Sequence, residues 1–258
     1  MANFHPVRRL PLKGAPNTRD LGGYPCAGGV TRWGAFLRSG STTKMTIPDI
    51  QALKAYGVYT SVDLRSGEER LAQPSALEAA PGFTTHSVPM LDNMNSAHFE
   101  GDLPGSMAGL YISLLDTAGA SFARLFSIFA AAQGGVLFHC AAGKDRTGVT
   151  AMLLLGLAGV PDPDIIADYA STDIYMREVF FHQVQSLQDS GVPDYIFRSM
   201  PKSMERTLKH LYKTYGSSEQ YLLGIGVTQR ELDTIKEKLI ERDAGMYSQP
   251  KCCHVYTS

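Results

Sequence analysis

Residues 136–157 constrain the fold of this chain more than any other stretch. A short apolar run at 136–138 leads into the polar loop 139–148, and a longer apolar run follows at 149–157. This pattern predicts a buried strand and a buried helix joined by a tight loop. Such a loop directs its backbone N–H groups and the positive end of the helix dipole towards one centre. The stretch therefore predicts an anion-binding site at the carboxyl end of a strand.

The loop reads His-Cys-Ala-Ala-Gly-Lys-Asp-Arg-Thr-Gly, with Cys140 near its start and Arg146 near its end. A cysteine attacks as the thiolate, which a helix N-terminus and nearby cations stabilise. Arginine presents a planar fork that binds two phosphoryl oxygens at once and keeps its charge at any working pH. We therefore expect Cys140 to attack a phosphoryl group and Arg146 to clamp it.

The other loop residues are expected to complete this site. Gly143 and Gly148 allow the positive φ angles or close approaches that a backbone cradle needs. Thr147 is expected to stabilise the sulfur of Cys140 when it leaves in a second step, and His139 to orient the loop through hydrogen bonds. The phosphate-binding cradle is expected to comprise Cys140, Ala141, Ala142, Gly143, Lys144, Asp145 and Arg146.

The spacing of Cys140 and Arg146 is a weak signal by itself. A Cys-x5-Arg pattern arises by chance, and an isolated buried cysteine is more often part of a core. The combination with His139, Thr147 and the loop glycines, placed between a strand and a buried helix, favours the functional interpretation.

Elsewhere the chain alternates between expected strands and helices. We expect strands at 34–38, 58–64 and 83–88, and helices at 48–57, 111–115, 122–132, 164–189, 201–215 and 228–240. This alternation predicts an α/β fold with a central, mostly parallel β-sheet flanked by helices. Ligands of such sheets bind beyond the carboxyl ends of the strands, where Cys140 and the segment 63–65 both fall. No linker or repeat divides the chain, so we expect one domain over 1–245 and a flexible tail over 246–258.

Composition excludes several classes of function. The 24 lysines and arginines nearly cancel the 25 acidic residues, so the chain as a whole has no attraction for nucleic acid or an anionic membrane surface. No apolar run approaches the roughly 18 residues of a membrane span, and no signal peptide is recognisable, so we expect a cytoplasmic protein without stable membrane insertion. Secretion without a signal and the oligomeric state stay open. The four cysteines are too scattered for a disulfide framework or a zinc site, and no metal or cofactor is expected.

Three motifs resemble those of the cysteine-dependent protein tyrosine phosphatases. They are the loop with its His-Cys-x5-Arg-Thr pattern, Asn-x-Arg-Asp-Leu-Gly-Gly at 17–23 and Val-Asp-Leu-Arg-Ser-x-x-Glu at 62–69. Ala-Gly-Lys-Asp-Arg inside the loop is similar to the bacterial branch of triple-specificity, or lipid-and-protein, phosphatases. The segment 215–227 resembles the C-terminal part of that branch.

This resemblance implies hydrolysis of phosphomonoesters through a cysteinyl-phosphate, without a metal. The implied partners are a phosphorylated protein, on phosphotyrosine and in some members phosphoserine or phosphothreonine, or a phospholipid head group. A helical lid over residues 174–200 is also implied, with an ordinary pair of surface helices as the equal alternative.

The general acid is the role with the most alternatives. Many phosphatases carry this aspartate on a loop upstream of the cysteine, but residues 105–115 contain none. The resemblance places it inside the loop, at Asp145, with a structural salt bridge as the alternative. Asp63 is the second choice, and a supporting network with Arg65 explains it equally well. We expect loop support from His139, Arg65 and Asp20.

Three competing functions use the same residues differently. A phosphoinositide phosphatase would use Lys144 beside Arg146 as extra positive charge for a polyphosphorylated head group. A non-catalytic phosphate-binding module would lack the nucleophile, the arginine or the acid, and none is missing here. A rhodanese-like sulfurtransferase has a shorter loop, and the ending Arg146–Thr147 suits phosphate better.

Overall fold

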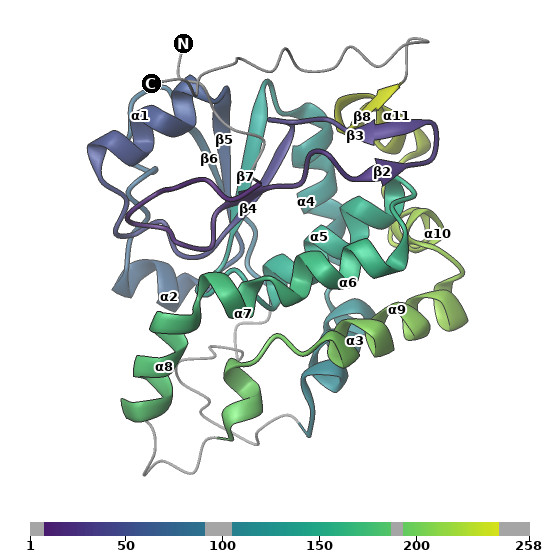
Figure 1. Ribbon diagram of the computed structural model, residues 1–258. Coiled ribbons are helices and arrows are strands. Elements are labelled where there is room, and N and C mark those ends of the chain that lie inside the picture. Colours follow the sequence, from purple (N-terminus) through teal and green to yellow (C-terminus); the bar gives the residue numbers. More distant parts are fainter. Residues whose placement is uncertain (1–7, 91–104, 187–192, 243–258) are drawn as a thin grey trace, which may run out of the picture.

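The structure is a computed structural model that describes residues 8–90, 105–186 and 193–242 (Figure 1). The expected tail at 246–258 lies outside these ranges. The strands are β1 Arg19–Asp20, β2 Pro25–Cys26, β3 Gly29–Thr31, β4 Phe36–Ser39, β5 Val58–Asp63, β6 Thr84–Ser87, β7 Gly135–His139 and β8 Ile240–Arg242. The helices are α1 Ile47–Ala55, α2 Gly67–Ala72, α3 Met107–Thr117, α4 Gly119–Ala131, α5 Arg146–Leu157, α6 Asp162–Ala170, α7 Thr172–Tyr175, α8 Arg177–Ser186, the 3-10 turn η2 Asp194–Phe197, α9 Pro201–Tyr215, α10 Ser218–Gly224 and α11 Gln229–Leu239.

Five strands form the central sheet, in the order β1-β4-β7-β5-β6. Strands β4, β7, β5 and β6 pair in parallel, and only the short edge strand β1 runs antiparallel. This confirms the predicted α/β fold with a mostly parallel sheet. The predicted strands and most predicted helices appear near their expected bounds, whereas β1, α2, η2, α10 and the small antiparallel sheet β2-β3-β8 were not predicted.

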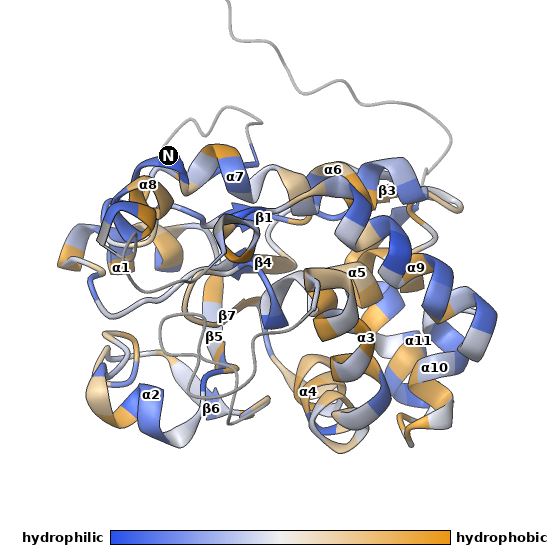
Figure 2. Cartoon of the chain, turned by 90° about the horizontal axis from the view of Figure 1, so that it is seen from below, coloured by the Kyte–Doolittle hydropathy of each residue, from blue (hydrophilic) through white to orange (hydrophobic). Residues whose placement is uncertain are grey.

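Helices cover both faces of the sheet. Seen from below, α1 and α2 lie on one side, and α3, α4, α5 and α9 to α11 lie on the other (Figure 2).

Every residue of β7 is buried, which explains why this central strand reads as a continuous apolar run. Phe129 of α4 packs on Phe138 of β7 with ring centroids 5.5 Å apart. Burial of one such ring stabilises the fold by about 1.5–3 kcal/mol.

The predicted long helix at 164–189 is wrong in one respect, because α6, α7 and α8 replace it within the described residues. The carbonyl oxygen of Asp168 accepts hydrogen bonds from the Arg19 guanidinium at 2.9 Å and from the Ser171 hydroxyl at 2.7 Å. These donors occupy the acceptor at the point where α6 ends, and Arg19 also donates to the Thr172 hydroxyl at 3.0 Å. The apolar spacing continues across this point, so periodicity alone could not locate the break.

No single helix in the described ranges is both long enough and apolar enough to cross a membrane. Helices α3 and α4 meet these criteria only as a pair, and they are bent by 76° relative to each other.

Candidate active site

The loop 139–148 lies at the carboxyl end of the central strand β7 and leads directly into α5. The strand pairings place Ser39 of β4 and Asp63 of β5 beside His139, so three strand ends meet here. Cys140 is buried, with 2% of its surface exposed. The two segments that the sequence placed at one sheet edge are therefore neighbours in the fold.

The carbonyl groups of residues 141–143 are held by hydrogen bonds from the N-terminal half of the chain. The backbone N–H of Ser41 donates to the first carbonyl at 2.7 Å. The amide of Asn17 donates to the second and third at 2.8 and 3.2 Å, and Arg38 donates to the third at 2.8 Å. Three donors thus fix three consecutive carbonyls and determine the orientation of their peptide planes.

The N–H groups of the same loop remain available. Among the described residues, none accepts a hydrogen bond from the backbone N–H of residues 141–145. Gly143 has φ of +70°, and a Cβ there would lie 2.4 Å from the carbonyl oxygen of Ser39. Only glycine fits both conditions. Unpaired N–H groups at the start of a helix bind an anion, as the sequence led us to expect.

Arg146 is held by a residue that the sequence interpretation did not assign to the site. Its two terminal nitrogens contact the two carboxylate oxygens of Glu69 at 2.6 and 2.9 Å. Burial lowers the pKa of Arg146, but the Glu69 hydrogen bonds and the negative charge at Cys140 outweigh it and raise the pKa. The guanidinium therefore keeps its charge despite being buried.

Glu69 also caps the helix that carries it. Its carboxylate accepts a hydrogen bond from the Ser66 N–H at 2.9 Å, and the Ser66 hydroxyl accepts one from the Glu69 N–H at 3.1 Å. This is a capping box at the start of α2. The Ser-x-x-Glu spacing was the available sequence signal for α2, and through it for the residue that orients Arg146.

Asp63 and Arg65 form a second wall beside the loop. The backbone N–H and the guanidinium of Arg65 donate to both oxygens of Asp63 at 2.7 to 3.1 Å. Burial raises the pKa of Asp63, but His139 and the hydrogen bonds and charge of Arg65 lower it further than burial raises it. A carboxylate held in its ionised form is a poor proton donor, so the geometry favours the supporting role over the acid role.

His139 lies completely buried between this wall and the β4 side of the loop. Its Nε2 is 3.8 Å from an Asp63 oxygen and 3.4 Å from the Thr42 hydroxyl, which in turn bonds Ser75 at 2.7 Å. Burial lowers the pKa of His139 more than the Asp63 charge raises it. The buried imidazole, which contacts Thr42 and lies beside Asp63, suits the predicted role in orienting the loop.

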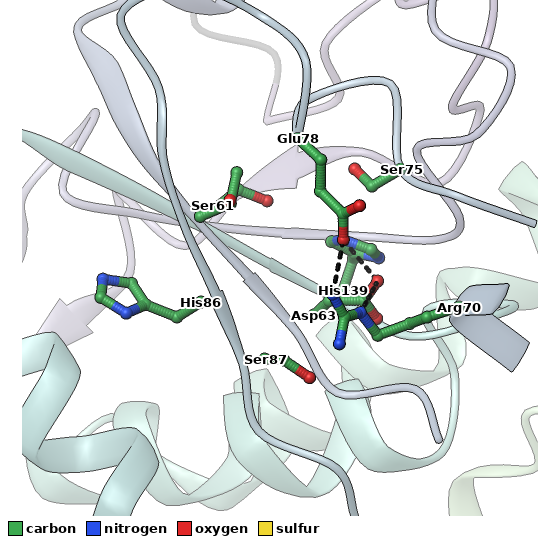
Figure 3. Close-up of a pocket in the computed structure, with 9 residues that line it drawn as sticks. Ser61, Asp63, Arg70, Ser75, Glu78, His86, Ser87 and His139 are labelled. Carbon is green, nitrogen blue, oxygen red and sulfur yellow. Dashed lines mark hydrogen bonds and ion pairs between the residues drawn. The ribbon is translucent and has the colours of Figure 1, made fainter. Parts of the chain in front are cut away.

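A polar pocket of about 250 Å³ lies against the same wall (Figure 3). Arg70 reaches across it to Glu78 at 2.8 Å, and its Nε is 3.9 Å from Asp63. The pocket is lined by Ser61, Asp63, Arg70, Ser75, Glu78, Thr85, His86, Ser87 and His139. Neither Cys140 nor Arg146 contributes to it. We therefore assign anion binding to the N–H groups of the loop. The pocket lies beside the residues that support the loop.

Asp145 stands at the start of α5, next to Arg146. One of its oxygens, Oδ1, accepts a hydrogen bond from the Tyr111 hydroxyl at 2.6 Å and lies 3.4 Å from the Lys144 ammonium. Among the described residues, no donor reaches the other oxygen. Asp145 thus has one fixed oxygen and one that is available to a substrate.

Lys144 has a different contact from the one that its sequence position suggested. Its ammonium group donates to the carbonyl oxygen of Ile196 in η2, and its side chain is 1% exposed. The Phe197 ring packs against Phe180 of α8 with centroids 6.4 Å apart. Within the described part of the predicted lid, η2 therefore adjoins the loop through Lys144, and α8 packs against η2.

Thr147 and Asp20 complete the predicted residues. The Thr147 hydroxyl is buried without a hydrogen-bond partner among the described residues, which leaves it available for a sulfur or phosphoryl oxygen. Asp20 accepts hydrogen bonds from the N–H groups of Gly22 and Gly34 and from the Tyr56 hydroxyl at 2.6 to 2.8 Å. It shapes the N-terminal arm and, within the described residues, forms no hydrogen bond or ion pair with the loop 139–148.

A second residue that the sequence interpretation missed is Asp168. It forms ion pairs with Arg19 at 2.9 Å and with Arg38, and all three side chains are 1% exposed. Burial raises the pKa of Asp168, but the two arginines lower it to about 2. Since Arg38 holds the Gly143 carbonyl, Asp168 supports the loop from α6. An aspartate in an amphipathic helix gives no sequence signal for such a role.

The sequence of the chain is similar to those of known phosphatases. The sequence model of the Tyrosine phosphatase family matches residues 10–241. The chain is 32% identical over 217 residues to a tyrosine-protein phosphatase of Nostoc commune, covering 80% of this chain and 74% of that one. It is 26% identical over 280 aligned positions to the triple specificity protein phosphatase PtpB of Mycobacterium tuberculosis, covering 91% and 99% of the two chains. Among solved structures, a P. aeruginosa TpbA variant in complex with phosphotyrosine aligns at 18% identity over 63% of this chain and 89% of that one, with a TM-score of 0.31.

Proposed function

Because the chain belongs to the tyrosine phosphatase family and has the protein tyrosine phosphatase-like activity that defines it, we propose that Cys140 carries the reaction through a cysteinyl-phosphate. The observation that supports this most directly is the loop itself. Its carbonyls are fixed by Ser41, Asn17 and Arg38, while the N–H groups of residues 141–145 have no partner among the described residues. An array of this kind stabilises the equatorial oxygens of a phosphoryl group in the transition state of its transfer.

In the first step the Cys140 thiolate attacks phosphorus, and an S–P bond forms as the bond from phosphorus to the leaving oxygen breaks. Arg146, oriented by Glu69, binds two phosphoryl oxygens through its planar fork. The leaving oxygen takes a proton from Asp145, whose second oxygen is available for this transfer. The products of this step are the free alcohol or phenol and the cysteinyl-phosphate.

In the second step a water molecule attacks the phosphocysteine. Its proton passes to the Asp145 carboxylate, the S–P bond breaks, and inorganic phosphate leaves. Cys140 departs as a thiolate, and the unpaired Thr147 hydroxyl is available to donate a hydrogen bond to it. Atoms and protons balance without a metal or a redox partner.

For the substrate we propose phosphotyrosine first, with phosphoserine, phosphothreonine and phosphoinositides as further candidates. The names of the relatives support the phosphotyrosine class, and one of them is a triple-specificity enzyme. The contact between Lys144 and η2 bears on the alternative. A polyphosphorylated head group would have to attract the Lys144 ammonium away from the Ile196 carbonyl.

A Cys140→Ser variant tests the covalent mechanism. It should lose hydrolysis of a small aryl phosphate and still bind vanadate or phosphate in the intact cradle. A variant that keeps turnover would contradict the proposal. A parallel panel of phosphotyrosine peptide, phosphoserine peptide and phosphoinositide, without added metal, then ranks the substrate classes for the wild-type enzyme.

A further inference from the structure

Two buried tyrosines approach the catalytic loop from outside it. The hydroxyl of Tyr111, on α3, donates to Asp145 Oδ1 at 2.6 Å, and the hydroxyl of Tyr169, on α6, lies 2.6 Å from that of Tyr111. The two rings are 0% and 1% exposed and meet edge to face, with centroids 5.7 Å apart at 79°. Neither residue belongs to the motifs that mark the loop.

The proton count fixes the direction of these hydrogen bonds. A tyrosine hydroxyl has one proton to donate. Tyr111 uses its proton on Asp145, so Tyr169 must donate to Tyr111. Burial first, and then the Asp145 charge, raise the pKa of both tyrosines, so both remain protonated donors. The chain therefore runs from Tyr169 through Tyr111 to Asp145 Oδ1.

We propose that Tyr111, supported by Tyr169, is a positioning residue that assigns the transferable proton of Asp145 to Oδ2. The proposal depends on the proposed acid role of Asp145. With Oδ1 already accepting from Tyr111, and with the Lys144 ammonium 3.4 Å from the same oxygen, the carboxyl proton belongs on Oδ2. Oδ2 is the oxygen that no described donor reaches. After the proton leaves, Tyr111 stabilises the carboxylate that forms.

Helix α6 places this pair accurately because it reaches the loop by two routes. Tyr169 acts through Tyr111 on Asp145, and its neighbour Asp168 acts through Arg38 on the Gly143 carbonyl of the loop. The Tyr169 ring also lies against the start of α5, where a Cβ on Gly148 would be 3.2 Å from it. One short helix thus sets both the cradle and the proton donor.

The experiment compares Tyr111→Phe with the wild-type enzyme on aryl phosphates of graded leaving-group basicity. Tyr111→Phe should lose about tenfold or more in kcat/KM on the poorest leaving groups and little on the best, because only poor leaving groups need the proton. Tyr169→Phe should show the same dependence at smaller amplitude. If Tyr111→Phe is too unstable for kinetics, the Tyr169→Phe variant still tests the positioning role.

Tyr221→Phe is the matched control. Its buried hydroxyl donates to the Leu115 carbonyl of the same helix α3 at 2.8 Å, so it loses a comparable hydrogen bond away from Asp145. This control should leave the leaving-group dependence unchanged. A uniform loss across all leaving groups in Tyr111→Phe, or a wild-type slope, would overturn the positioning role.

Asp145→Asn, measured in parallel, separates the acid role of Asp145 from the positioning role of Tyr111. If Asp145→Asn becomes steeply dependent on the leaving group and Tyr111→Phe does not, only the positioning role fails. If Asp145→Asn shows no such dependence, the acid assignment fails and the positioning role fails with it.

Discussion

Replacing Glu69 by glutamine should damage catalysis although Glu69 does not touch the reacting phosphoryl group. The variant removes one charge-assisted hydrogen bond to Arg146 and places an amide N–H against the guanidinium. In the structure the two hydrogen bonds of 2.6 and 2.9 Å fix the plane of the fork, and the side chains are only 3% and 7% exposed. Leaving a buried charge without its partner costs about 3–5 kcal/mol in the pairs studied.

Part of that cost should appear in the transition state. If misorientation of Arg146 costs about 1.4–2.8 kcal/mol there, kcat falls by about 10- to 100-fold. The affinity for inorganic phosphate should change less, since the unpaired guanidinium still attracts an anion. Steady-state kinetics on an aryl phosphate and phosphate inhibition give the two quantities separately.

Glu231→Gln is the matched control for the helix-capping role. Glu231 closes a capping box at α11 and accepts from the Thr228 N–H at 2.9 Å, as Glu69 does from Ser66. Among the described residues, however, it pairs with no arginine and makes no hydrogen bond to the loop. Its kcat should stay at the wild-type value. A Glu69→Gln enzyme whose kcat lies within about twofold of wild type, or about 0.4 kcal/mol, would refute the orienting role of Glu69.

Three further outcomes follow from the same geometry. Gly143→Ala should abolish vanadate binding in a titration, because its Cβ would lie 2.4 Å from the Ser39 carbonyl oxygen. Gly226→Ala is the control: Gly226 has a φ of +100° and a Cβ there would have no atom within 4 Å. This variant has only the backbone strain and should bind vanadate normally. Burial raises the pKa of Asp168, but its two arginines lower it to about 2 in the folded protein. The unfolded-state pKa is about 3.9, so ionised Asp168 stabilises the fold above that pH. This contribution to the free energy of unfolding is lost as the pH falls towards 2. Asp168→Asn should therefore lower the free energy of unfolding at pH 7 by about 2–3 kcal/mol, and a denaturant series should show a flatter dependence between pH 4 and 2. Lys144→Met should alter turnover of a phosphoinositide more than that of a phosphotyrosine peptide, and equal effects on both would remove Lys144 from substrate selection.

The sequence predicted the sheet and the loop because both depend on local patterns. The apolar run of β7, the glycines of the loop and the apolar run of α5 are contiguous, and each obeys a local rule. The neighbourhood of Asp63 and His139 followed from the general rule that ligands of parallel sheets bind beyond the carboxyl ends of the strands. These predictions needed no knowledge of distant contacts.

The distant contacts through which the loop is oriented could not be found in this way. Glu69, Asp168 and Tyr111 act through contacts with residues between 34 and 149 positions away in the chain. In the sequence they look like an N-terminal helix acid and two ordinary helix positions. The division of α6 from α7 was hidden for the same reason, since it depends on hydrogen bonds from the distant Arg19.

The most direct test of the central claim is to trap the covalent intermediate. Asp145→Asn enzyme is mixed with an aryl phosphate that has a good leaving group, quenched in acid, and examined by peptide mass spectrometry. The covalent mechanism predicts a phosphoryl group on the peptide that contains Cys140, and none on the same peptide from a Cys140→Ser enzyme treated in parallel. A phosphoryl group on any other residue, or turnover that persists in Cys140→Ser, would contradict it.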